Sequence, residues 1–133
     1  MLTRRAEITP YRTLDGSEIH ELMHPDHHPV RRQSLALAVV AAGTATRPHR
    51  HREAEEIYHI LAGRGRMTLG GEQFPVEEGD SVLIPPGTFH HIENVGAGPL
   101  RFLCSCSPAY RHEDTELLEI SDFGHYTNAV ALL

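Results

Sequence analysis

Four side chains in this sequence have the residue types and the spacing of a metal site. His49 and His51 are two residues apart in an extended context, where side chains at i and i+2 point to the same face. Glu56 opens the next predicted strand and is the better inward candidate, because Glu55 would point the other way. His90 opens a later predicted strand. Three neutral imidazoles and one carboxylate suit a divalent first-row metal and leave positions free for water, substrate or O₂.

Short strands must position these side chains. From Ser34 onward, short alternating runs are separated by turns rich in glycine and proline; the runs are 35–40, 44–51, 56–61, 66–69, 72–76, 81–84, 90–94 and 100–106. Gly70-Gly71 between two such runs predicts a two-residue hairpin. Parallel crossovers need a dozen or more residues, so the sheets must be antiparallel. So many short strands predict an all-β barrel or sandwich.

The length of 133 residues predicts one domain. We expect an N-terminal arm with the first strand or strands over 1–33, the barrel over 34–108, and a C-terminal extension over 109–133 that packs on the barrel. Two prolines place the histidine-rich stretch 24–29 in a loop or an extended arm. Residues 114–119 fit either a capped helical turn or a final strand.

Composition limits which binding partners and which cellular compartment we expect. Twelve basic and eighteen acidic residues give a net charge of −6, which argues against nucleic acid or an anionic membrane as a partner. The longest apolar run, 35–42, is far shorter than the ~20 residues of a spanning helix. The first residues do not resemble a secretory signal, so we expect a cytoplasmic protein. Two cysteines one residue apart, Cys104 and Cys106, do not make a disulfide framework.

The surroundings of the four candidate ligands resemble the two signatures of the cupin superfamily. The first signature matches at Gly43, His49, His51, Glu56 and Gly63, and the second at Gly79, Pro85, Gly87, His90 and Asn94. The resemblance to small single-domain metal-binding cupins implies an antiparallel jelly-roll barrel, or double-stranded β-helix. It also implies one divalent transition metal per chain (Fe, Mn, Ni, Co, Zn or Cu), held by His49, His51, Glu56 and His90.

Several other side chains have two interpretations each. Tyr58 shares the face of Glu56 and is either a tentative catalytic residue or a packed barrel residue. Cys104 and Cys106 either face the metal cavity or are small buried apolar residues. Arg47 either faces inward, toward an anionic substrate, or lies at the rim. The histidines of 24–28 either cap the barrel mouth or form a solvated loop.

The resemblance leaves three functions open for a protein whose partner is a small-molecule substrate or ligand. The first is a dioxygenase or related oxidoreductase with a 3-His/1-Glu centre. The second is a non-redox isomerase, cyclase or lyase, in which the metal acts as a Lewis acid. The third is a non-catalytic sensor or ligand-binding protein. Open-edge strands and the N-terminal arm predict a homodimer, because strand exchange would cover the edges.

Overall fold

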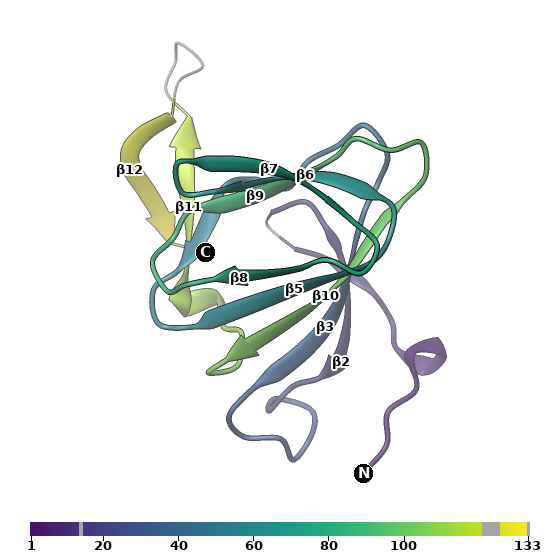
Figure 1. The fold of residues 1–133 in the computed structure, drawn as a ribbon. Coiled ribbons are helices and arrows are strands. Elements are labelled where there is room, and N and C mark those ends of the chain that lie inside the picture. Colours follow the sequence, from purple (N-terminus) through teal and green to yellow (C-terminus); the bar gives the residue numbers. More distant parts are fainter. Residues whose placement is uncertain (14, 121–125, 133) are drawn as a thin grey trace.

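A computed structural model of the chain describes residues 1–13, 15–120 and 126–132, and its strands form two six-stranded antiparallel sheets (Figure 1). The first sheet has the strand order β1 (Tyr11–Arg12), β2 (Glu18–Met23), β3 (Ser34–Val40), β10 (Leu100–Ser107), β5 (Glu55–Ala62) and β8 (Ser81–Ile84). The second has the order β12 (Tyr126–Leu132), β11 (Thr115–Ile120), β4 (His49–His51), β9 (His90–Asn94), β6 (Arg64–Leu69) and β7 (Glu72–Glu77). Two short 3₁₀ helices, η1 (Arg5–Glu7) and η2 (His112–Asp114), complete the described elements. The predicted all-β antiparallel fold is confirmed.

The alternating pattern of the sequence decides which side chains enter the space between the sheets. Along β5, Glu56, Tyr58 and Ile60 are buried, whereas Glu55 and Ile57 are exposed. The buried core is shared by both sheets and consists of Ala38, Val40, Tyr58, Ile60, Met67, Val76, Val82, Ile84, Ile92, Leu100 and Phe102. Each large side chain in it stabilises the fold by roughly 1.5–3 kcal/mol through burial.

The turns between strands follow the glycines. Leu69 and Glu72 are partners in the ladder of β6 and β7, so Gly70-Gly71 forms the predicted two-residue hairpin. Gly63 has a φ of +88°, and a Cβ there would lie 2.8 Å from the carbonyl oxygen of Pro99. That position therefore requires glycine on two grounds, backbone conformation and close approach.

The strand before the metal-site histidines is shorter than predicted. Only His49–His51 forms β4, and the preceding residues contribute a single bridge, between Ala45 and Glu93. Pro48 has no backbone N–H to donate to a ladder, which ends regular pairing there.

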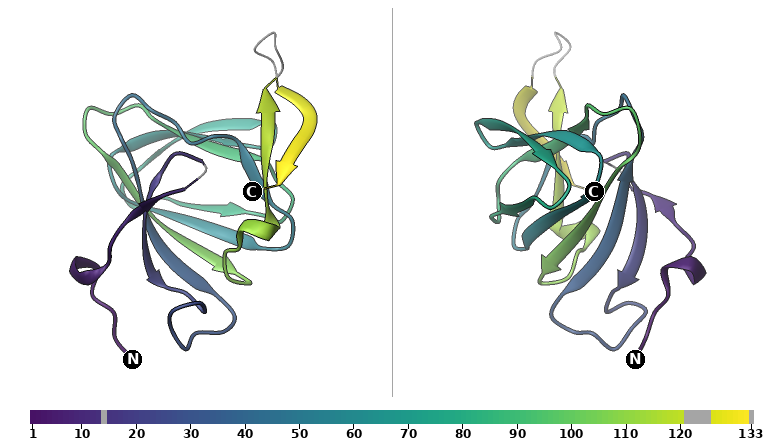
Figure 2. Two further views of the ribbon diagram at one scale, coloured as in Figure 1. Left: turned by 180° about the vertical axis from the view of Figure 1, so that it is seen from behind. Right: turned by 45° about the vertical axis from the view of Figure 1, so that its right-hand side comes forward.

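The segments on either side of 34–108 extend the two sheets. β2 pairs with β3 in the first sheet, and β11 pairs with β4 in the second, so residues 115–120 adopt the strand alternative. In both views of Figure 2 the N-terminal residues run outside the two sheets. None of the described residues belongs to a helix long and apolar enough to cross a membrane.

Candidate metal centre

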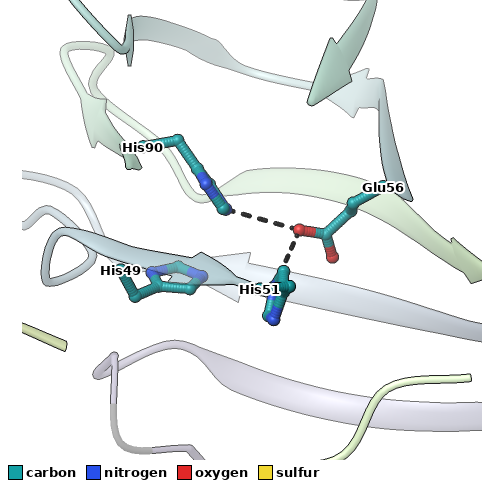
Figure 3. A group of neighbouring side chains, drawn as sticks. All are labelled: His49, His51, Glu56 and His90. Atoms are coloured by element: carbon teal, nitrogen blue, oxygen red, sulfur yellow. Dashed lines mark hydrogen bonds and ion pairs between the residues drawn. The ribbon is translucent and has the colours of Figure 1, made fainter. Parts of the chain in front are cut away.

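The four predicted ligands meet in one place. His49 and His51 come from β4, Glu56 from β5 and His90 from β9, and His49 and His90 are direct partners across the β4–β9 pair. One ligand atom from each residue lies within 4.8 Å of the others, and all four side chains are buried. Figure 3 shows the three imidazoles and the carboxylate gathered around a common point.

Two of the imidazoles are held by backbone carbonyl groups. Nδ1 of His49 donates to the carbonyl oxygen of Arg47 at 2.8 Å, and Nδ1 of His90 donates to that of Thr88 at 2.9 Å. A carbonyl oxygen can only accept, so Nδ1 carries the proton in the neutral ring. Nε2 of both histidines therefore keeps a lone pair that faces the cluster, the arrangement usual for metal-binding histidines.

The third imidazole is held by a threonine from the C-terminal part of the chain. Nδ1 of His51 lies 2.9 Å from Oγ1 of Thr115. The Thr115 hydroxyl donates its own proton to the carbonyl oxygen of Arg111 at 2.9 Å, so it accepts from His51. The neutral His51 ring is thus fixed in the same tautomer as the other two.

The two carboxylate oxygens of Glu56 have different partners. Oε1 lies 3.2 Å from Nε2 of His51 and 3.4 Å from Nε2 of His90. Oε2 instead accepts a hydrogen bond from the thiol of Cys106 at 3.1 Å. Oε1 is therefore the oxygen that faces the cluster and is free for a metal.

These donors fit a divalent transition metal. Within the described part of the chain, Nε2 of His90 is buried without a hydrogen-bond partner. A buried polar atom without a partner is costly, and a cation shared by three imidazole nitrogens and a carboxylate oxygen would satisfy it. The cluster could therefore hold a metal ion.

The four buried side chains shift one another's pKa values. Burial alone would raise the pKa of Glu56, but the imidazoles of His51 and His90 at its carboxylate hold that pKa well below its usual value. Burial would lower the pKa of His51, yet the hydrogen bond and charge of Glu56 raise it. Burial and the neighbouring His90 lower the pKa of His49 to about 4. The Glu56 carboxylate and the His51 imidazole thus stabilise each other's charged forms.

The cluster borders a cavity of about 60 Å³, several times the space that one water molecule needs. Tyr58 lines it, only 2% exposed, with its ring 4.6 Å from that of Phe102 and 5.9 Å from that of His90. Burial raises the pKa of the Tyr58 phenol well above its ordinary value. Tyr58 is thus both a packed barrel residue and part of the cavity wall, and its catalytic role stays a prediction.

Other predicted residues divide between the cavity and the surface. Cys104 and Cys106 line the cavity, as the cavity-facing interpretation required. The side chain of Arg47 is exposed and does not line it. His24 is buried and within hydrogen-bonding distance of the carbonyl oxygen of Tyr110, so the solvated-loop interpretation is wrong for His24, although His27 is exposed.

Sequence reasoning missed two residues that belong to the site. Asp15, in the turn between β1 and β2, lines the cavity, with Oδ2 3.9 Å from Nε2 of His49. Thr115 supports His51 from β11. The Asp15-Gly16 pair marks a turn in the sequence, but nothing in the sequence indicates that this turn lies over the cluster.

Comparison with known proteins gives the family. A family model described as a cupin domain matches residues 36–106. An uncharacterised protein of Methanocaldococcus jannaschii is 53% identical over 117 residues, which are 88% of this chain and 94% of that protein. An oxalate-binding protein of Thermotoga maritima is 31% identical over 77% of this chain and 90% of its own length.

Solved structures agree with this assignment. A predicted oxalate decarboxylase from Thermotoga maritima superposes with a TM-score of 0.73 at 29% identity, over 81% of this chain and 99% of that one. KdgF from Halomonas sp. shares the fold, with a TM-score of 0.72 at 18% identity over 84% and 96% of the two chains. The matching family model, the two six-stranded sheets and the four-residue cluster lead to one conclusion: the chain belongs to the cupin family.

Proposed function

We propose that this protein binds one divalent transition metal and is an enzyme that acts on a small organic molecule. The observation that carries the proposal is the convergence of three oriented Nε2 lone pairs and one carboxylate oxygen beside a cavity. When bound, the metal supplies Lewis acidity and, if it is redox-active, electron transfer. Nitrogen donors with one carboxylate suit Fe, Mn, Ni, Co, Zn or Cu rather than the hard cations Mg²⁺ and Ca²⁺.

The first reaction class is that of a dioxygenase or related oxidoreductase. The cavity lining also contains Ile19, Ala38 and Phe102, which give it an apolar part. Such a wall excludes water and admits an apolar gas such as O₂ beside an organic substrate. Four protein ligands would leave two octahedral positions for the two reactants.

The second reaction class is non-redox chemistry by an isomerase, cyclase or lyase, and one observation favours it. Such reactions need a group that moves a proton, and the Oδ2 atom of Asp15 faces the cluster from 3.9 Å. A relative of this chain, a polyketide synthase CurC of Streptomyces cyaneus, is 31% identical over 87% of this chain. A polyketide-like carbonyl compound therefore belongs among the substrates to be tested.

A ligand-binding protein without turnover is the alternative to an enzyme. The oxalate-binding relative from Thermotoga maritima supports this alternative by its name. A binder would show a thermal midpoint that rises with ligand concentration and would convert nothing.

Turnover assays on two metal forms test the proposal. Protein loaded with Fe²⁺ or with Zn²⁺ is incubated with a panel of small carbonyl, hydroxy and carboxylic compounds, with and without O₂, and His49→Ala is assayed in parallel. We expect turnover that His49→Ala loses. Turnover that requires Fe²⁺ and O₂ assigns the oxidoreductase class, and anaerobic turnover with Zn²⁺ assigns the non-redox class. No turnover by either form, with a thermal midpoint that a panel compound raises, would contradict the enzyme proposal.

A further inference from the structure

A carboxylate from outside the predicted ligand set faces the metal centre. Asp15 lies in the turn between β1 and β2, and its side chain is 15% exposed. Its backbone is tied to the strand region that carries the histidines, because the N–H of Arg47 donates to the carbonyl oxygen of Asp15 at 2.8 Å. The position of this carboxylate is therefore fixed relative to His49.

Local hydrogen bonds occupy one carboxylate oxygen of Asp15, Oδ1, and leave the other, Oδ2, without a donor among the described residues. Oδ1 accepts from the Thr13 hydroxyl, from the Ser17 hydroxyl at 2.6 Å and from the Ser17 N–H at 2.9 Å. No donor among the described residues is within hydrogen-bonding distance of Oδ2, which points toward Nε2 of His49 at 3.9 Å. A carboxylate held by three donors has a fixed orientation, so Oδ2 is a preorganised acceptor at the cavity wall.

Among the described residues, carboxylates line the cavity but no arginine does. Its lining includes the carboxylates of Asp15, Glu21 and Glu56, and none of the twelve arginines, which are the only basic residues besides histidine. Arg50 and Arg52 are engaged elsewhere, with Glu116. A carboxylate ligand at the metal would therefore meet the charge of Asp15 without a guanidinium to offset it.

We infer that Asp15 selects the ligand of this centre: it accepts a hydrogen bond from a hydroxyl or amino group of a small neutral or cationic molecule, and it disfavours small carboxylate anions. The inference rests on the proposed metal function and names the substrate class for that site. An unpaired acceptor beside the metal discriminates strongly between ligands that do and do not bring a donor.

A pair of probes that differ in charge tests the inference. Glycolate and glycolamide have nearly the same shape and can both bind a metal through two oxygens, but only glycolate is an anion. The dissociation constants of both are measured on fully Co²⁺-loaded protein from the visible absorption of the metal. Asp15→Asn retains Oδ1 as an acceptor for Thr13 and Ser17, so the turn is preserved while the charge is removed. Glu72→Gln removes an equal charge from the exposed part of β7 and serves as the control.

Asp15→Asn is expected to shift the ratio of the two dissociation constants toward glycolate by about tenfold or more, which corresponds to about 1.4 kcal/mol. Glu72→Gln is expected to leave the ratio within about twofold of wild type. An unchanged ratio in Co²⁺-loaded Asp15→Asn would overturn the inference and leave the metal function standing. Wild-type protein that takes up no Co²⁺ would overturn the proposed function and the inference with it.

Discussion

At the scale of single residues, the two carboxylate oxygens of Glu56 have different roles. Oε1 faces the imidazoles, and Oε2 is occupied by the thiol of Cys106. The thiol is buried, and burial with the neighbouring Glu56 carboxylate raises its pKa far above the ordinary value, so it stays a donor. Cys106 is therefore a positioning residue that makes Glu56 a ligand through one oxygen.

Removing the thiol should weaken metal binding. Cys106→Ala leaves Oε2 of Glu56 buried without its donor, and we expect metal affinity to fall about tenfold. Cys106→Ser restores a donor and should lie within about threefold of wild type. Cys104→Ala is the matched control, since no hydrogen bond joins Cys104 to Glu56. Competition with a chelating dye measures all four affinities, and equal affinities in Cys106→Ala and wild type would contradict the assigned role.

Proton competition at His51 should make metal binding depend on pH. The metal needs the neutral ring, and the charge of Glu56 raises the pKa of His51 above its ordinary value. Affinity should therefore fall as the pH drops through that raised pKa, by up to about tenfold per pH unit. His49, with a pKa of about 4, adds no competition near neutral pH. Zn²⁺ titrations between about pH 5 and pH 8 check this, and a flat affinity over that range would contradict it.

At the scale of elements, local patterns predict the strands that carry the ligands but not the strands that support them. The alternation of apolar and polar residues places His49, His51 and Glu56 correctly, since it depends only on the period of a β-strand. Asp15 and Thr115 reach the site through pairings of distant segments, and 64 residues separate Thr115 from its partner His51. Which strand pairs with β4 depends on packing of the whole chain, which local sequence does not encode.

The turn after β5 should be sensitive to a single methyl group. Gly63→Ala places a residue with a side chain at a φ of +88°, with its Cβ 2.8 Å from the carbonyl oxygen of Pro99. We expect the free energy of unfolding to fall by about 2 kcal/mol, from backbone strain and the close contact together. Gly71→Ala is the control, because a Cβ there meets no atom within 4 Å. Urea unfolding of metal-free protein measures both, and equal stabilities would contradict this reading of the turn.

At the scale of the whole molecule, the outer face of the first sheet carries an exposed apolar pair at its edge. Ile57 and Leu83 are partners across β5 and β8 and are 44% and 55% exposed. β8 is also an edge strand of its sheet, with backbone groups available for pairing. Exposed apolar residues at an open edge favour association with a second copy of the chain.

We therefore expect a homodimer in solution that uses this edge. Light scattering should give twice the 14.8 kDa mass of one chain. Leu83→Arg should shift the protein toward the monomer, because it places a charge on the apolar face. Gln73→Arg, on the exposed part of β7, adds the same charge to the other sheet and should leave the mass unchanged. A wild-type monomer at micromolar concentration would contradict the expectation.

Metal content tests whether His49, His51, Glu56 and His90 bind a metal. Mass spectrometry is applied to untagged protein purified without chelator, beside the double variant His49→Ala/His90→Ala. The double variant His27→Ala/His91→Ala removes two histidines outside the cluster and serves as the control. We predict about one equivalent of a transition metal in wild type and control, and its loss in the cluster variant. No stoichiometric metal in the wild type, even after reconstitution, or equal metal in the cluster variant, would contradict metal binding by these four residues.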